Sequence, residues 1–287
     1  MIFSFFWIQS YLYYFSKVNP LYPFITLTND ILIYTFGITL TLCFFSFSWM
    51  LSKLSERFWY DFSLFSKNIL FFFLSTFIFS RLFYVISKWN DLKFIKEPLE
   101  FFIMSDYNFS LYGAIFWFLL VLFLLLGTKK DKIIRYIDWV VLSFLFVLVI
   151  GYIWSLFWWQ VYGRQTNIGI EIAYTHPLSP IPYQLPLFPL PIVYAFLFFL
   201  LFSLLYILST FIRVRGFIGH VWLIAFWTIL LIFEFLSGKT DIFVQYIHIN
   251  MNQLLSLFLI GAVSYSFFHF IKESSLDRSA TILSHKH

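Results

Sequence analysis

Long apolar runs alternate with short polar stretches along the chain. Seven of these runs are each long enough to cross a hydrocarbon core of about 30 Å as a helix that rises about 1.5 Å per residue. In lipid every backbone amide must be paired within its own segment, so the pattern predicts an all-α bundle of seven transmembrane helices. The predicted spans are Ile31–Leu51, Asn68–Ser87, Phe109–Gly127, Ile137–Trp159, Ile192–Phe211, Phe217–Leu236 and Met251–Ile271.

Composition agrees with a polytopic membrane protein. Of the 287 residues, 61% are hydrophobic and only 11% are charged, whereas a soluble domain carries about a quarter charged residues. The aromatic residues are spread along the whole chain and do not indicate a cofactor box. The formal net charge of +5 requires no nucleic acid as a partner, because the cytoplasmic loops of membrane proteins are basic.

Lysine and arginine are unevenly divided between the loops on the two sides of the membrane. With the N-terminus outside, about twice as many of them fall on the inner side as on the outer side, which favours an N-out/C-in orientation. We expect residues 1–28 to form an interfacial N-terminal segment with a short helix, and no signal peptide. Residues 29–272 then form the seven-helix membrane domain, and residues 273–287 a cytoplasmic tail.

A polar turn and a proline-rich loop follow the fourth run, on the predicted outer side. The segment Val149–Glu171 begins in apolar sequence and ends in a loop that contains Arg164 among Trp and Tyr residues. Arg164 can anchor the chain at the interface, or it can hold a lipid phosphate with its planar guanidinium. Six prolines between Pro177 and Pro191 exclude a helix interior and predict an extended outer loop.

Charged residues within or at the ends of the apolar runs are a second signal. Each costs about 2.5–3.5 kcal/mol at a helix centre, so each is expected to face the interior of the bundle. Arg81 and Glu234 are the natural candidates for an ion pair, which could link two spans or take part in chemistry. The four residues are Asp30, Arg81, Asp138 and Glu234.

Familiar catalytic signatures are missing from the sequence. It contains no His, Cys and carboxylate cluster with metal spacing, no glycine-rich phosphate loop and no serine in a nucleophile elbow. Its single cysteine, Cys43, lies in an apolar run and cannot form an intrachain disulfide. We therefore expect neither a metal ion nor a cofactor, and spacing alone leads only to a seven-span protein with a polar outer vestibule.

Seven short motifs occur in order between Asp30 and Ile271. They are Ile33–Gly37, Ser80–Tyr84, Ser110–Ala114, Gly151–Arg164, Val193–Ala195, Phe233–Phe235 and Met251–Leu257. In this order they resemble the motifs of the prolipoprotein diacylglyceryl transferase family. Any one match is weak, because apolar runs resemble one another, whereas the ordered series favours this fold and family.

The resemblance implies an activity and a location. The family has seven spans in an N-out/C-in orientation in the bacterial plasma (inner) membrane. Its members transfer the diacylglyceryl group of phosphatidylglycerol to the lipobox cysteine thiol of a lipoprotein precursor. The implied partners are therefore phosphatidylglycerol and the signal peptide of a lipoprotein precursor.

Carried over residue by residue, the resemblance also implies a site. The implied catalytic residues are Tyr112, Tyr152, Gln160 and Glu234. The implied lipid- and phosphate-binding residues are Arg164, Arg81, Gly151, Ser155 and Gly163. Several of these positions depart from the family pattern: Tyr112 replaces a histidine, Tyr152 an arginine, Ser155 an asparagine, Gln160 a glutamate, Phe36 a tyrosine and Leu230 an arginine.

Two hypotheses follow from these departures. The chain is either an active, divergent transferase or a catalytically inactive protein that binds a lipid or a partner in the same groove. The chemistry needs a base for the thiol and cations for the phosphate, and a tyrosine with an ordinary pKa near 10 is a poor base. A transporter is less favoured, because the sequence shows neither paired broken helices nor an internal repeat.

Overall fold

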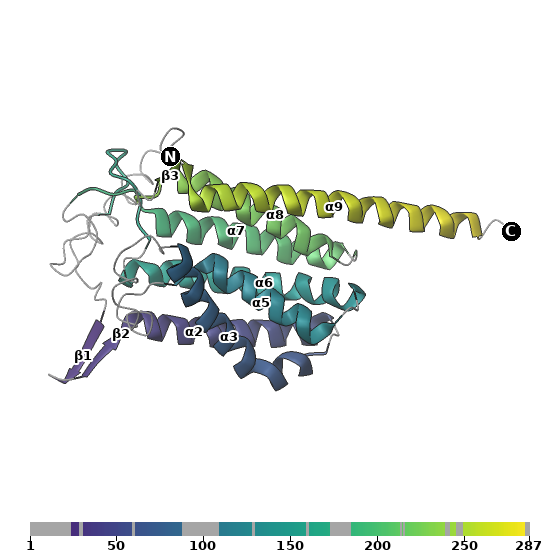
Figure 1. Cartoon of the computed structure of the whole chain (residues 1–287), viewed down its shortest axis with the longest axis horizontal. Helices are drawn as coiled ribbons and strands as arrows, with labels where there is room; N and C mark the ends of the chain where they lie inside the picture. Colours follow the sequence, from purple (N-terminus) through teal and green to yellow (C-terminus); the bar gives the residue numbers. More distant parts are fainter. Residues whose placement is uncertain are drawn as a thin grey trace. The chain divides into compact units, whose positions relative to one another are not determined.

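The computed structural model of the chain describes residues 24–28, 31–58, 61–87, 109–127, 130–158, 161–172, 185–212, 214, 216–238, 242–244 and 249–284. Within these ranges it contains seven helices and four short strands (Figure 1). They belong to two compact units. The N-terminal unit spans Tyr22–Gln160, and the described residues of the C-terminal unit fall within Val161–His287.

The four helices of the N-terminal unit correspond to the first four predicted spans. They are α2 (Thr35–Phe58), α3 (Ser63–Ser87), α5 (Leu111–Leu126) and α6 (Lys130–Trp158). α2 packs against α6, and α3 packs against α5. A buried apolar cluster that includes Leu51, Phe72 and Leu122 joins these helices.

α3 begins five residues before the start that hydropathy predicted. Both carboxylate oxygens of Asp61 accept hydrogen bonds from Ser63, one from its amide at 2.8 Å and one from its hydroxyl at 2.7 Å. Asp61 thereby satisfies donors that a helix N-terminus leaves unpaired. At Asn68 the backbone departs from helical geometry, with φ −114° and ψ 16°, so the predicted start of the span coincides with a kink.

The C-terminal unit contains the last three helices. They are α7 (Leu190–Phe211), α8 (Phe217–Glu234) and α9 (Met251–Ser284). α8 packs against both α7 and α9, and the fully buried rings of Phe198 and Phe226 meet in its core. Figure 1 draws α9 as one continuous helix, which extends beyond the predicted end of the seventh span at Ile271.

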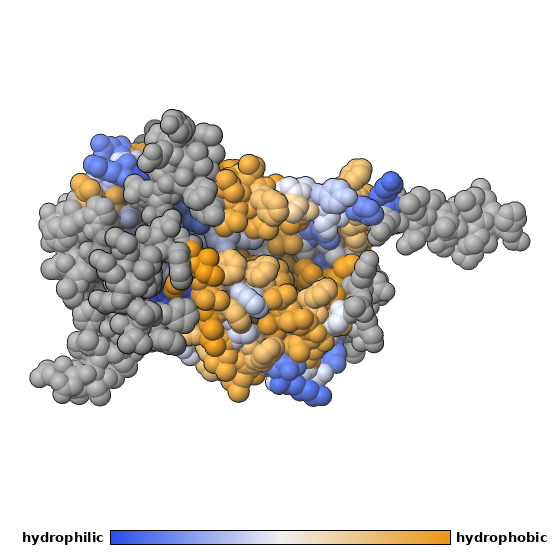
Figure 2. All heavy atoms as spheres, viewed as in Figure 1, coloured by the Kyte–Doolittle hydropathy of each residue, from blue (hydrophilic) through white to orange (hydrophobic). Residues whose placement is uncertain are grey.

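The helices show the surface that a membrane requires. Six of them are long and apolar enough to span a bilayer, and α5 is a shorter apolar helix of 16 residues. Large apolar side chains are exposed along the helices, as the orange surface in Figure 2 shows. These features confirm a helical, multi-pass membrane protein, whereas the count of seven spans and the N-out/C-in orientation stay predictions.

Two short antiparallel hairpins depart from the predicted all-α pattern. In the N-terminal unit β1 (Phe24–Thr28) pairs with β2 (Ile31–Tyr34), and in the C-terminal unit β3 (Ile242–Val244) pairs with β4 (Ile249–Asn250). Residues 24–28, at the end of the predicted interfacial segment, form a strand, which isoleucine and threonine favour, and the short helix expected within residues 1–28 stays a prediction. Among the described residues the first helix begins at Thr35, and residues 1–23 lie outside the described ranges.

Candidate functional site

In the C-terminal unit, the extended segment Tyr162–Arg164 lies between two other backbone segments. On one side the amide of Arg164 donates to the carbonyl oxygen of Leu236 at 2.8 Å. On the other side the amide of Phe188 donates to the carbonyl oxygen of Arg164 at 2.9 Å. Backbone hydrogen bonds from both directions therefore position the residue that the sequence singled out for phosphate binding.

Two glycines allow these segments to approach closely. A Cβ atom on Gly163 would overlap the carbonyl oxygen of Phe188. A Cβ atom on Gly238 would overlap the ring of Tyr162, whose carbonyl oxygen accepts the Gly238 amide at 3.0 Å. Gly163, which the resemblance assigned to lipid binding, thus has a steric role that holds Arg164 in place.

The side chain of Arg164 is exposed but oriented. Its Nε donates to the carbonyl oxygen of Ser237 at 3.2 Å. That bond uses one of the five N–H donors of the guanidinium group. A planar cation held in this way, at the surface of its unit, suits two-point recognition of a phosphate.

Glu234 ends α8 next to the same turn. Its carboxylate Oε1 accepts a hydrogen bond from Nδ2 of Asn252, in the first turn of α9, at 3.1 Å. Its carbonyl oxygen accepts the amide of Ser237 at 3.0 Å. Because Ser237 bonds to both Arg164 and Glu234, one short turn places a guanidinium and a carboxylate in the same region.

In the N-terminal unit, a pair of serines joins α3 to the start of α5. The hydroxyl of Ser80 donates to the carbonyl oxygen of Ser110 at 2.7 Å, and the amide of Ser110 donates to the carbonyl oxygen of Ser80 at 3.1 Å. The Ser110 hydroxyl also caps α5 by accepting the amide of Gly113 at 3.2 Å. The predicted residues Arg81 and Tyr112 therefore lie on two joined segments.

Arg81 is buried, with only 6% of its surface exposed. Its guanidinium carbon lies 5.8 Å from the ring centroids of both Tyr84 and Phe109. Aromatic faces attract a cation at this distance, and burial of arginine in an apolar helix is costly unless its charge is stabilised. The prediction that Arg81 points into the protein is confirmed, and Asp138 is also only 6% exposed.

The other predicted residues of this unit lie on α6. Gly151 faces α2, because a Cβ atom placed on it would come within 3.7 Å of the sulfur of Cys43. Ser155 is buried and donates its hydroxyl to the carbonyl oxygen of Tyr152 at 2.7 Å, within the same helix. Tyr152 is half-buried, and Gln160 lies outside the described residues.

The structure thus divides the predicted site residues into two sets. The C-terminal unit brings together Gly163, Arg164 and Glu234, and the N-terminal unit contains Arg81, Tyr112, Gly151, Tyr152 and Ser155. An ion pair between Arg81 and Glu234 would join residues of different units, and it stays a prediction.

Sequence reasoning missed the residues that hold Arg164. Ser237, Gly238 and Phe188 supply its hydrogen-bond partners or the room for its backbone. The one local signal was the Ser237-Gly238 pair, since a small residue followed by glycine after an apolar helix indicates a turn or a close approach of backbone.

Comparison with known proteins agrees with the motifs and the fold. Residues 23–269 match the family model described as prolipoprotein diacylglyceryl transferase, a range that runs from the first hairpin into α9 and includes both units. No curated protein matches the chain. The protein is a multi-pass membrane protein that belongs to the prolipoprotein diacylglyceryl transferase family.

Proposed function

We propose that this protein transfers the diacylglyceryl group of phosphatidylglycerol to the lipobox cysteine thiol of a lipoprotein precursor in a bacterial plasma membrane. Membership of the family supports the reaction class. The observation that carries the proposal is the arrangement around Arg164, where backbone bonds and a 3.2 Å bond from Nε orient an exposed guanidinium. Such a cation is what the transfer of a phosphate-bearing lipid requires.

The reaction makes one bond and breaks another. The precursor thiol loses its proton, and the thiolate attacks the glyceryl carbon that carries the phosphate. A carbon–sulfur bond forms while the bond from that carbon to the phosphate oxygen breaks. Glycerol phosphate leaves with the electron pair, so negative charge grows on the phosphate and a guanidinium beside it stabilises the transition state.

Each proposed residue has a distinct role in this scheme. Arg164 holds the phosphate, and Arg81, in the N-terminal unit, is the alternative cation for this role. Glu234 supplies a carboxylate for the proton of the thiol, and its bond to Asn252 at 3.1 Å sets its direction. The remaining side chains place the substrates through hydrogen bonds, and they are Tyr112, Tyr152, Gln160 and Ser155.

A direct assay tests the proposal. Purified protein is incubated with phosphatidylglycerol radiolabelled in its acyl chains and with a lipobox peptide. We expect label on the peptide cysteine, and a loss of at least tenfold in rate in Arg164→Ala. Arg57→Ala, which removes an exposed arginine in the last turn of α2, is the matched control and should transfer at the normal rate. If the wild-type protein transfers no label to the peptide, the proposal is contradicted.

A second candidate is a protein of the same fold that binds the lipid, or a lipoprotein, without turnover. Leu230 favours it, because this residue is buried and apolar, with 7% of its surface exposed, at a position that the resemblance matches to an arginine of the family. The same two reagents separate the candidates. Saturable binding of phosphatidylglycerol without transfer would support the inactive protein, and transfer would exclude it.

A further inference from the structure

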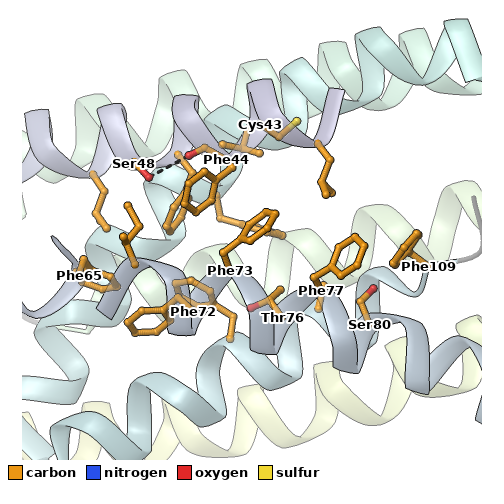
Figure 3. A pocket seen from close by; sticks show the side chains of 18 of the residues that line it. Cys43, Phe44, Ser48, Phe65, Phe72, Phe73, Thr76, Phe77, Ser80 and Phe109 are labelled. Carbon is orange, nitrogen blue, oxygen red and sulfur yellow. Dashed lines mark hydrogen bonds between the residues drawn. The ribbon is translucent and has the colours of Figure 1, made fainter. Parts of the chain in front are cut away.

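A cleft between α2 and α3 lies apart from the proposed catalytic residues in the N-terminal unit. Its volume is about 210 Å³, and side chains of α5 and α6 complete its walls (Figure 3). The predicted site residues that the structure describes do not line it. The cleft extends from Leu51 and Phe65 at one end to Ser80 and Phe109 at the other.

The shape and lining of the cleft suit a linear apolar ligand. Phe65 and Ser80 of α3 are fifteen positions apart, which corresponds to about 22 Å along a helix. Phe72, Phe73 and Phe77 project from α3 into the lining, as Figure 3 shows. The cleft is also larger than an apolar cavity of about 150 Å³ that admits benzene.

One hydroxyl group interrupts this apolar lining. Other helical threonines donate to a carbonyl oxygen three or four residues earlier, as Thr39 does at 2.9 Å and Thr210 at 2.7 Å. The buried hydroxyl of Thr76 has no hydrogen-bond partner among the residues that the structure describes. The neighbouring Ser75 hydroxyl, by contrast, donates to the carbonyl oxygen of Phe71 at 2.6 Å. Because Thr76 lines the cleft, its wall contains a donor without a partner.

A cation lies near one end of the same cleft. Arg81 follows the lining residue Ser80, and its guanidinium carbon is 5.8 Å from the ring centroid of Phe109, another lining residue. Thr76 precedes Arg81 by five residues, which is about 7.5 Å along the helix axis. The order cation, hydroxyl donor and apolar groove matches the order phosphate, ester carbonyl and acyl chain in a phospholipid.

We propose that this cleft holds one acyl chain of an anionic diester phospholipid, with the Thr76 hydroxyl donating to the ester carbonyl and the phosphate at the Arg81 end. Thr76 is then a residue that selects ester-linked lipids. The inference rests on the proposed function, because the lipid is the one whose diacylglyceryl group is transferred. It adds a subsite whose lining lies mostly outside the motifs of the chain.

Crosslinking locates the acyl chain. The probe is phosphatidylglycerol with a photoactivatable group in the middle of one acyl chain, bound to the full-length protein in detergent. We expect crosslinks to peptides of α2 and α3 that line the cleft, and competition by unlabelled phosphatidylglycerol. Ala114→Phe fills the cleft from α5 and should remove these crosslinks. Leu124→Phe, on the same helix but 65% exposed, is the matched control and should keep them.

A nearly isosteric substitution tests the hydroxyl separately. Thr76→Val keeps the shape of the side chain and removes its donor. We expect diester phosphatidylglycerol to compete about fivefold less well in this variant, the effect of one neutral hydrogen bond. Diether phosphatidylglycerol, which lacks the carbonyl, should compete equally well in the variant and the wild type. Thr76→Ser should restore the preference for the diester.

The outcomes distinguish this inference from the proposed function. Crosslinks on other segments, crosslinks that unlabelled lipid does not displace, or an unchanged diester affinity in Thr76→Val would each overturn the acyl subsite. Transfer to the lipobox peptide in those cases would leave the proposed function standing. Specific crosslinks in the cleft without any transfer would support the subsite and contradict the transferase.

Discussion

Arg164 combines exposure with a fixed orientation. Its Nε donates to the carbonyl oxygen of Ser237 while the planar guanidinium keeps two terminal nitrogens for a phosphate, which the single nitrogen of lysine cannot reproduce. We expect Arg164→Lys to weaken the binding of phosphatidylglycerol, and Arg164→Ala to cost about 1.5–3 kcal/mol of binding free energy for the lost charged hydrogen bond. Both affinities are measured in detergent at fixed salt concentration.

The controls for Arg164 separate phosphate binding from anchoring. Arg57→Lys and Arg57→Ala, at an exposed position on α2, should leave the affinity unchanged. If Arg164 serves only as an interface anchor, lysine replaces it without loss, because both side chains can extend to the interface. Equal lipid affinity in the wild type and both Arg164 variants would establish the anchor and end the phosphate interpretation.

At the scale of elements, the close packing of the three backbone segments around Gly163 requires a residue without a side chain. Gly163→Ala places a Cβ atom against the backbone of Phe188, so we expect a loss of about 1–3 kcal/mol in unfolding free energy, as in other overpacked sites. Gly261→Ala in α9 is the matched control. Nothing lies within 4 Å of its added Cβ, so alanine should be neutral or slightly stabilising. Thermal unfolding in detergent measures the stability of both variants. Equal stability of the two would refute the close approach of Gly163 to the backbone of Phe188.

The helices were predictable from sequence because, in lipid, a long apolar segment can pair all of its backbone amides only by forming a helix. Helix α8 thus begins at the predicted residue, Phe217, and ends at Glu234, two residues before the predicted end at Leu236. The hairpin of β1 and β2 was missed, since strands of five and four residues carry a weak pattern beside a longer apolar run. The support of Arg164 was also missed, because it comes from Ser237, 73 residues away, and no spacing rule predicts such a contact.

For the whole molecule, the predicted pair of Arg81 and Glu234 would link the two units. Removing one partner of a buried pair strands the other charge and costs about 3–5 kcal/mol, so each single variant should lose about that much stability. The double variant should lose less than the sum. Unfolding of Arg81→Gln, Glu234→Gln and the double variant measures the coupling, and additive losses would show that the residues are not partners.

An exposed pair in α2 provides the control for this cycle. Lys53 Nζ lies 2.9 Å from Glu56 Oε2, and their side chains are 55% and 63% exposed. Exposed pairs contribute only about 0–1 kcal/mol, because solvent screens them. Lys53→Gln and Glu56→Gln should therefore change stability little, alone or together.

The orientation of the chain is a separate prediction at this scale. The excess of basic residues on one side predicts a cytoplasmic C-terminus and an external proline-rich loop. In a Cys43→Ala background, Ser179→Cys should react with a membrane-impermeant thiol reagent added outside intact cells. Labelling only after the membrane is permeabilised would show the opposite orientation, and it would place the proposed outer site on the cytoplasmic side.

The length of α5 has a consequence for the surrounding bilayer. Its 16 residues rise about 24 Å, less than the hydrocarbon core of about 30 Å. Lipids around this helix adapt to such hydrophobic mismatch by thinning locally. In the predicted orientation the start of α5 at Ser110, beside Ser80, lies toward the outer leaflet, and thinning brings the outer head groups closer to it. Reconstituted protein should therefore transfer faster in bilayers of short-chain lipids, since a thicker membrane would keep the head groups farther from the Arg81 end of the cleft.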